Sequence, residues 1–169
     1  MGHRLFRFSP PAWLNSPNTR TAGVYVSGGL FSIGFFVLLN AAIFSHAKYR
    51  GECKVTFVDW IPAICSSLGM LVINSIEKSR LSADSYSYSG TGVAWKARVV
   101  LFLGFALMAG GLAGSVTILV LKYIRPGVPF PPLGFGISDV VSNVLVMLSS
   151  VVLWVSQNLE NEYSYNLTL

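Results

Sequence analysis

The stretch VVLFLGFALMAGGLAGSVTILVL (Val99–Leu121) decides the fold of this protein, because it contains no charged residue and is bounded by Arg98 and Lys122. At 1.5 Å rise per residue it forms a helix roughly 34 Å long, enough to cross the roughly 30 Å hydrocarbon core of a bilayer. A helix in a water-soluble core rarely needs that length. The stretch therefore predicts a transmembrane helix.

On a helical wheel, this stretch divides into two strips of small residues and an arc of bulky ones. In lipid, close backbone approach at small residues is a main driver of helix association. We therefore expect both strips to face neighbouring helices and the arc to face lipid. The alternative is that glycine is simply common in membrane helices. The first strip is Ala106, Ala109, Gly110, Ala113, Gly114 and Thr117, the second is Gly104, Gly111 and Ser115, and the arc is Leu101, Phe102, Phe105, Met108, Leu112, Val116, Leu119 and Val120.

The composition of the whole chain agrees with a membrane protein. Its 169 residues are 53% hydrophobic and only 11% charged, unlike an ordinary water-soluble domain. The net charge of +5 comes from residues that flank the apolar segments, so it indicates topology and contact with anionic lipid headgroups, not nucleic-acid binding. Cys53 and Cys65 cannot define a disulfide framework and indicate neither a redox nor a metal site.

Three further segments are long and apolar enough to span a bilayer, so we predict an all-α integral membrane protein with four transmembrane helices in a small bundle. Glycine and serine make the first half of the first span thin, which suits packing against the central helix. The predicted organisation is an interfacial arm (alternatively a disordered tail) at 1–20, a membrane domain at 21–157 with spans at about 22–44, 57–76, 99–121 and 135–156, and a short C-terminal tail at 158–169.

Five polar side chains within the spans are candidates for a structural or functional role. Asp59 can cap the second span, with Pro62 in the first turn, where its missing N–H costs no helical hydrogen bond. Asp59 and Asn74 share one helical face and Asp139 and Asn143 share another, and we expect both faces to turn inward, because polar groups facing lipid are costly. A hydrogen bond to a neighbouring helix is the expected role of Asn40. The five are Asn40, Asp59, Asn74, Asp139 and Asn143.

No catalytic constellation is found in the sequence. His3 and His46 form no paired-histidine metal motif, and there is no Gly-x-Ser-x-Gly elbow, phosphate-binding loop or cysteine with a plausible base. We therefore expect no enzymatic activity, cofactor or metal. An alternative is a small transporter, channel or lipid-handling protein that uses the polar faces as a water-lined path. Asp59 and Asp139 lie near span ends, however, whereas transporters usually place such groups nearer the midplane.

The basic residues predict an orientation. Seven of the 12 Lys and Arg residues lie in the N-terminal arm and the second loop, and the other five lie in the first and third loops. Because basic residues accumulate on the cytosolic side, both termini are expected in the cytosol. Four basic residues that border the second loop are also candidates for contact with anionic membrane lipids, and they are Lys78, Arg80, Lys96 and Arg98.

Four runs of sequence are distinctive: TRTAGVYVSGGLFSIGFFVLLNAA (19–42), VTFVDWIPAICSSLGMLVINSIEKSRL (55–81), WKARVVLFLGFALMAGGLAGSVTILVLKY (95–123) and the terminal YNLTL (165–169). They closely resemble the transmembrane protein 50 family, most of all its fungal branch. The likeness covers about residues 19–169. The N-terminal arm and the proline-rich third loop match less clearly.

The resemblance implies a non-enzymatic, four-span protein of late endosomes that assists transport from endosome to vacuole. It implies a complex with another small four-span protein, vacuolar protein sorting-associated protein 55, and the animal relatives are also associated with the endoplasmic reticulum and Golgi. We expect contact with membrane lipids and with cytosolic sorting machinery. The candidates for helix packing or the partner interface are Gly104, Ala106, Gly110, Gly111, Gly114 and Ser115.

Overall fold

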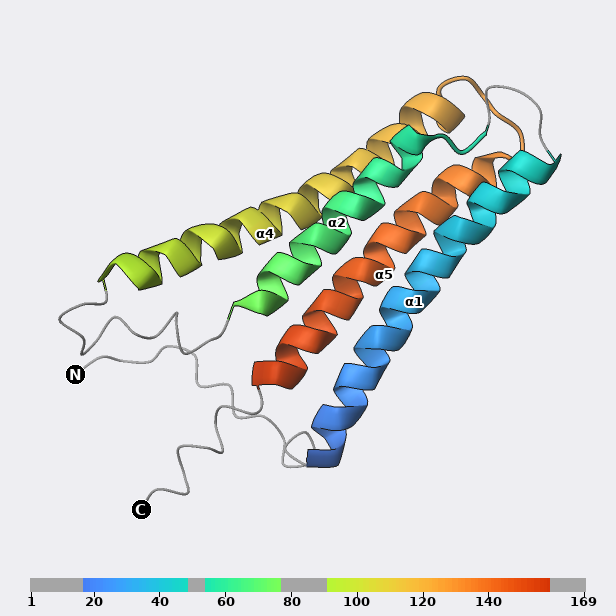
Figure 1. Cartoon of the computed structure of the whole chain (residues 1–169). Coiled ribbons are helices and arrows are strands. Elements are labelled where there is room, and N and C mark those ends of the chain that lie inside the picture. The colour runs from blue at the N-terminus through green and yellow to red at the C-terminus, as the bar shows by residue number, and fades with distance from the viewer. Residues whose placement is uncertain (1–16, 49–53, 77–90, 159–169) are drawn as a thin grey trace, which may run out of the picture.

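The structure, a computed structural model, describes residues 17–48, 54–76 and 91–158. These residues form long helices and no strand (Figure 1). The helices are α1 (Pro17–Lys48), α2 (Phe57–Ser75), α4 (Thr91–Ile118) and α5 (Leu133–Asn158), and a π-helical turn, η3 (Leu119–Ile124), continues α4. Four helices are long and apolar enough to cross a membrane, which confirms the predicted all-α fold with four spans.

Local sequence explains where two of the helices begin. α1 begins at Pro17, a residue whose fixed φ suits the first helical position. α2 begins after Thr56, whose backbone N–H donates to the Asp59 carboxylate in a capping box. Pro62 is the sixth residue of α2 and lies beyond the first turn, so the expected position is wrong and its missing N–H removes one helical hydrogen bond, although α2 continues to Ser75.

The helices pack as two pairs. α1 lies along α5 and α2 lies along α4, while contacts between α2 and α5 join the pairs (Figure 1). α1 makes no extensive contact with α4, so the expected packing of the first span against the central helix is wrong. The small residues of α1 pack against α5 instead. A Cβ at Gly23 would collide with Ser156, and a Cβ at Gly34 would crowd Ser142 and Leu145.

The two pairs are tied together at the end of the bundle that carries η3. Tyr123 of η3 is 1% exposed and packs in an apolar cluster with Ala41, Ala42, Val55 and Phe135. Gly136 of α5 allows this close approach, since a Cβ there would stand 2.6 Å from Tyr123 Cδ2. The sequence did not predict the π-helical turn.

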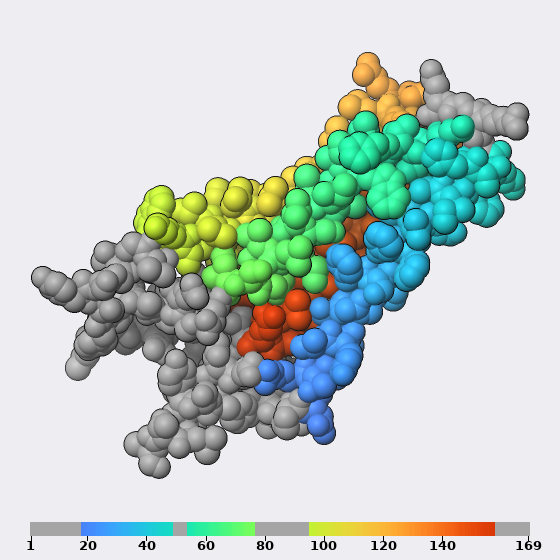
Figure 2. Space-filling model, in the orientation of Figure 1, coloured from blue at the N-terminus to red at the C-terminus, as the bar shows by residue number. Residues whose placement is uncertain are grey.

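Because α1 does not cover α2, the bundle is open along its sides. Figure 2 shows α5 between α1 and α2. A cavity of about 190 Å³ lies here, lined by Phe31 and Phe35 of α1, Ala63 and Ile64 of α2, and Val146 of α5. A second cavity, of about 320 Å³, lies where α4 and α5 diverge. Both are lined by residues of candidate membrane spans.

Candidate helix-packing interfaces and polar sites

The strip of Gly104, Gly111 and Ser115 packs against α2. A Cβ at Gly111 would collide with Ser66 Oγ and stand 2.7 Å from the carbonyl oxygen of Pro62. A Cβ at Gly104 would likewise meet Ile73 and the backbone of Gly69. Ser115 is fully buried and donates to the carbonyl of Leu112. Gly104 and Gly111 therefore hold α4 against α2 within the chain, while the hydrogen bond of Ser115 stays within α4.

The other strip, which includes Ala106, Gly110, Ala113 and Gly114, is open along most of its length in the described part of the chain. Ala106, Gly110 and Ala113 are exposed, and a Cβ at Gly110 would meet nothing within 4 Å. Gly114 is half-buried beside Pro62, and a Cβ at Gly114 would stand 3.4 Å from Pro62 Cγ. The six candidates thus divide between a filled interface and an open one, although both strips were expected to face neighbouring helices.

Part of the bulky arc faces outward, whereas Leu119 packs against the core cluster and Met108 is buried. Phe102, Phe105 and Val120 are among the exposed large side chains. Met108 is only 4% exposed, because it fills the space above Gly69 of α2. The expectation that Met108 faces lipid is wrong, and the reason is that a glycine on α2 lets a long side chain from α4 enter the interface.

A seam of polar side chains joins α2 to α5. Ser66 Oγ donates to Asn143 Oδ1 at 2.6 Å, and Asn143 Nδ2 donates to Asp139 Oδ1 at 3.2 Å. Two turns further along, Asn74 Nδ2 donates to Ser150 Oγ at 3.1 Å. Asp139 and Asn143 are almost completely buried, so their face of α5 turns inward as predicted. This seam brings together three of the five polar candidates.

The polar contact between α5 and α1 was not predicted from the sequence. Ser149 Oγ donates to the carbonyl oxygen of Ser27 at 2.8 Å. Ser142, Ser149 and Ser156 follow a seven-residue spacing, and all three are buried. Because this spacing keeps side chains on one helix face, it is the sequence signal that could have identified the face of α5 that contacts α1.

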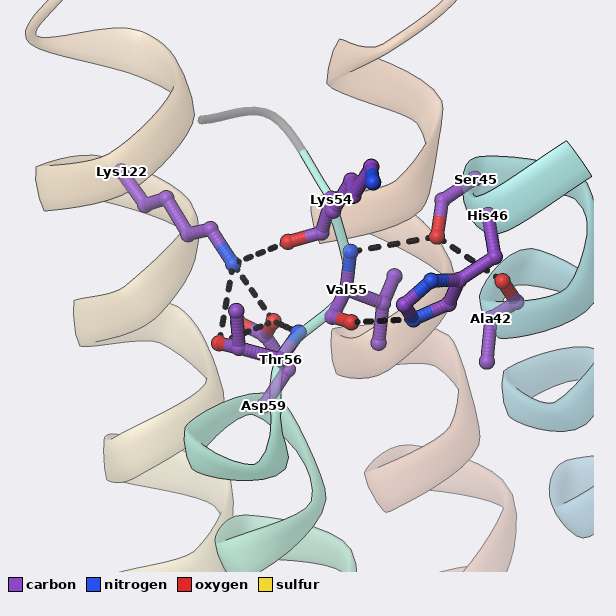
Figure 3. Close-up of polar contacts among 8 residues, drawn as sticks. All are labelled: Ala42, Ser45, His46, Lys54, Val55, Thr56, Asp59 and Lys122. Carbon is purple, nitrogen blue, oxygen red and sulfur yellow. Dashed lines mark hydrogen bonds and ion pairs between the residues drawn. The ribbon is translucent and has the colours of Figure 1, made fainter. Parts of the chain in front are cut away.

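Around the start of α2, Asp59 gathers several donors (Figure 3). Asp59 Oδ2 forms an ion pair with Lys122 Nζ of η3 at 2.5 Å and accepts a hydrogen bond from Thr56 Oγ1 at 3.1 Å. Lys122 Nζ also donates to the carbonyl oxygen of Lys54 at 2.7 Å. Asp59 is 2% exposed, so the capping role predicted for it is joined by an ion pair that ties α2 to η3.

The segment that precedes α2 is also bonded to the end of α1. Val55 N–H donates to Ser45 Oγ, and His46 Nε2 lies 3.1 Å from the carbonyl oxygen of Val55 (Figure 3). Ser45 in turn donates to the carbonyl oxygen of Ala42. These bonds connect the end of α1 to the segment before α2, and nothing in the spacing of Ser45 and His46 predicted them.

Several predicted residues stand apart from these contacts. Asn40 is exposed, and its side chain makes no hydrogen bond within the described ranges, so the expected interhelical bond is not present. The contacts of α1 with α5 are made at other positions, such as Gly23 and Gly34. Lys96 and Arg98 are both exposed near the start of α4, whereas Lys78 and Arg80 lie outside the described residues, as do 1–16 of the arm and 159–169 of the tail.

Ionisable side chains of the described residues take part in hydrogen bonds and an ion pair. Within 17–48, 54–76 and 91–158, no three His, Cys, Asp or Glu side chains are grouped as they would be to hold a metal ion. The carboxylates of Asp59 and Asp139 instead accept hydrogen bonds from neighbouring helices or from their own. The sites that the fold builds are therefore helix interfaces.

Comparison with known proteins places this arrangement in a family. The model of an uncharacterised protein family, UPF0220, matches residues 1–163. The chain belongs to this family. Vacuolar protein sorting-associated protein 68 of Saccharomyces cerevisiae is 48% identical, in an alignment covering 98% of this chain and 96% of that protein. The UPF0220 protein C8D2.02c of Schizosaccharomyces pombe is 45% identical over 90% of this chain and 89% of that protein.

A more distant relative confirms the resemblance drawn from the sequence. The transmembrane protein 50 homolog of Dictyostelium discoideum is 26% identical, over 76% of this chain and 84% of that protein. No solved structure matches the chain. With four apolar helices and these relatives, the UPF0220 chain is a multi-pass membrane protein.

Proposed function

We propose that this chain is a non-enzymatic membrane subunit of an endosomal sorting complex that assists protein transport from endosome to vacuole. The name of the Saccharomyces cerevisiae relative, vacuolar protein sorting-associated protein 68, supports the sorting role, since 48% identity over nearly the whole length makes a shared role the simplest interpretation. In this proposal the chain works by packing a helix against a small multi-span partner similar to vacuolar protein sorting-associated protein 55.

The observation that carries the partner interface is the open strip on α4. Ala106, Gly110 and Ala113 leave the backbone of α4 accessible, and nothing in the described chain comes within 4 Å of the Cβ position at Gly110. The strip that contains Gly104 and Gly111 is an example within this chain, because these two glycines let α2 approach α4 to backbone contact. A partner helix could pack against Gly110 in the same way.

The remaining features of the proposal follow from the sequence. We propose that the protein resides in the late endosome or vacuole membrane, with the endoplasmic reticulum or Golgi as the alternative. Both termini lie in the cytosol in this proposal, where soluble sorting machinery would reach them. The first helix begins and the last helix ends at the same end of the bundle, which agrees with termini on one side (Figure 1).

The internal polar bonds favour packing over the alternative of a transporter, channel or lipid-handling protein. Ser66, Asn143 and Asp139 bond to one another between α2 and α5 in place of lining an aqueous path. The two cavities beside the seam are lined mainly by apolar side chains. Reconstituted vesicles whose permeability depends on the Asp139 carboxylate, and is lost in Asp139→Asn, would favour the alternative instead.

The proposal is tested by affinity purification of the full chain in mild detergent, followed by mass spectrometry. We expect one small multi-span partner in near-equal amount, and we expect Gly110→Leu to lose it while the chain still inserts and folds. Gly29→Leu is the matched control, because Gly29 on α1 is also a glycine with nothing within 4 Å of its Cβ position. Retention of the partner by Gly110→Leu, or its loss only in Gly29→Leu, would overturn the α4 interface.

A further inference from the structure

The larger cavity is a blind groove between α4 and α5. α4 with η3 and α5 meet at one end, where Gly136 admits Tyr123 and Leu119, and they diverge toward the start of α4 (Figure 1). The groove has a volume of about 320 Å³. The side chains that line it include Phe105, Met108, Ala109, Met147, Val151 and Trp154.

The setting of the groove determines what can occupy it. Its lining is apolar apart from Ser150, whose hydroxyl already accepts a hydrogen bond from Asn74, so water has too few partners there. α4 and α5, and α2, which contributes Ile73 to the lining, are all candidate membrane spans. A transmembrane helix of a partner needs a groove that runs on in both directions, whereas a lipid acyl chain can end inside a blind one. The shape therefore favours an acyl chain.

The positive charge of Arg98, at the end of the groove near the start of α4, favours a lipid with an anionic headgroup. Arg98 is exposed and lies seven residues before Phe105, which puts both on one face of α4. From Arg98 to Met108 the helix rises roughly 15 Å, which is half of a hydrocarbon core of about 30 Å. A chain that fills the groove thus leaves its headgroup at the level of Arg98. Trp154, which is 45% exposed, lines the same groove near the end of α5 and suits the interface.

We propose that the groove between α4 and α5 binds one acyl chain of an anionic phospholipid, whose net negative headgroup pairs with Arg98. Lys96 does not contribute, because it lies about 160° around α4 from Arg98 and faces the side of Gly110. The groove shares Ala109 with the small-residue strip but lies toward α5, away from Gly110, so this site goes beyond the proposed sorting role and does not depend on it.

Native mass spectrometry of the full chain in mild detergent tests the proposal. Phosphatidylserine and phosphatidylcholine with the same acyl chains are added in equal amounts. We expect one bound lipid, with phosphatidylserine preferred at least threefold. Arg98→Gln should abolish the preference and Lys96→Gln, which removes the same charge two residues away, should keep it. Equal binding of the two lipids, or equal effects of the two variants, would overturn the headgroup assignment.

The acyl-chain assignment has its own test. Ala109→Trp fills the groove and should remove the bound lipid, whereas Ile64→Trp at the other cavity should not. Because Ala109→Trp could fail to fold, phosphatidylserine with a photoactivatable acyl chain is also applied to the unchanged protein. We expect labelling of α4 and α5 peptides that contain Phe105 and Met147. Labelling elsewhere, displacement of the lipid by inorganic phosphate alone, or cross-linking of a partner helix within the groove would refute the site.

Discussion

Gly110 and Gly111 are neighbours in α4 but have opposite surroundings. A Cβ at Gly111 would collide with Ser66 Oγ, while a Cβ at Gly110 would meet nothing within 4 Å. Because consecutive residues point about 100° apart around a helix, one glycine serves the contact with α2 and the other faces away from it. Substitutions at Gly111 should therefore affect folding of the chain, whereas substitutions at Gly110 should affect its proposed association with a partner.

The first prediction concerns stability at these two glycines. Gly111→Ala should destabilise the protein by about 1–3 kcal/mol, because Pro62 presents a backbone carbonyl oxygen 2.7 Å from the new Cβ and cannot easily move. Gly110→Ala should change stability by less than about 1 kcal/mol, since alanine favours a helix and meets no neighbour. Thermal unfolding in detergent measures both. Equal loss in the two variants would contradict the structure.

The second prediction concerns the ion pair between Asp59 and Lys122. Lys122→Met should destabilise the protein by about 1–3 kcal/mol, below the value for a fully buried pair, because the Lys122 side chain is 23% exposed. Stability is lost because the Asp59 carboxylate, whose side chain is only 3% exposed, would no longer be paired with a cation. The double variant Asp59→Asn with Lys122→Met should lose less than the sum of the two single changes. Additive losses would show that the pair makes no coupled contribution.

The third prediction concerns the hydrogen bond between Ser66 and Asn143. Ser66→Ala should cost about 0.6 kcal/mol, the average for interhelical polar bonds in membranes, and at most about 1.7 kcal/mol. Ser75→Ala is the control, because Ser75 Oγ bonds only to its own helix, at Leu71. Unfolding in mixed detergent compares the two. A loss at Ser66 larger than that of Gly111→Ala would mean that the polar seam outweighs steric fit.

The fourth prediction concerns orientation. In a background of Cys53→Ser and Cys65→Ser, Asn18→Cys at the start of α1 should react with an impermeant thiol reagent in intact organelles. Arg125→Cys, which follows η3 at the opposite end of the bundle, should react only after permeabilisation. The sequon Asn166-Leu167-Thr168 should carry no glycan in that orientation. The reverse labelling pattern would place both termini in the lumen.

Some features of the site could be predicted from helical periodicity. Asp139 and Asn143 are one turn apart, so they had to share a face, and a polar face within an apolar span had to turn toward protein. Their partner could not be predicted, because Ser66 lies 77 residues earlier in the chain. The position of Met108 was also beyond reach, since only Gly69 on another helix makes room for it.

The sequence by itself determined that the chain is a four-helix membrane protein, because apolar length and flanking charge are properties of each segment alone. The sequence also marked Gly110 and Gly111 as small. Only the tertiary structure decided that Gly111 contacts α2 and that Gly110 is left open. The choice of neighbour depends on how complete helix surfaces fit together, and in lipid no gain in apolar burial distinguishes one pairing from another.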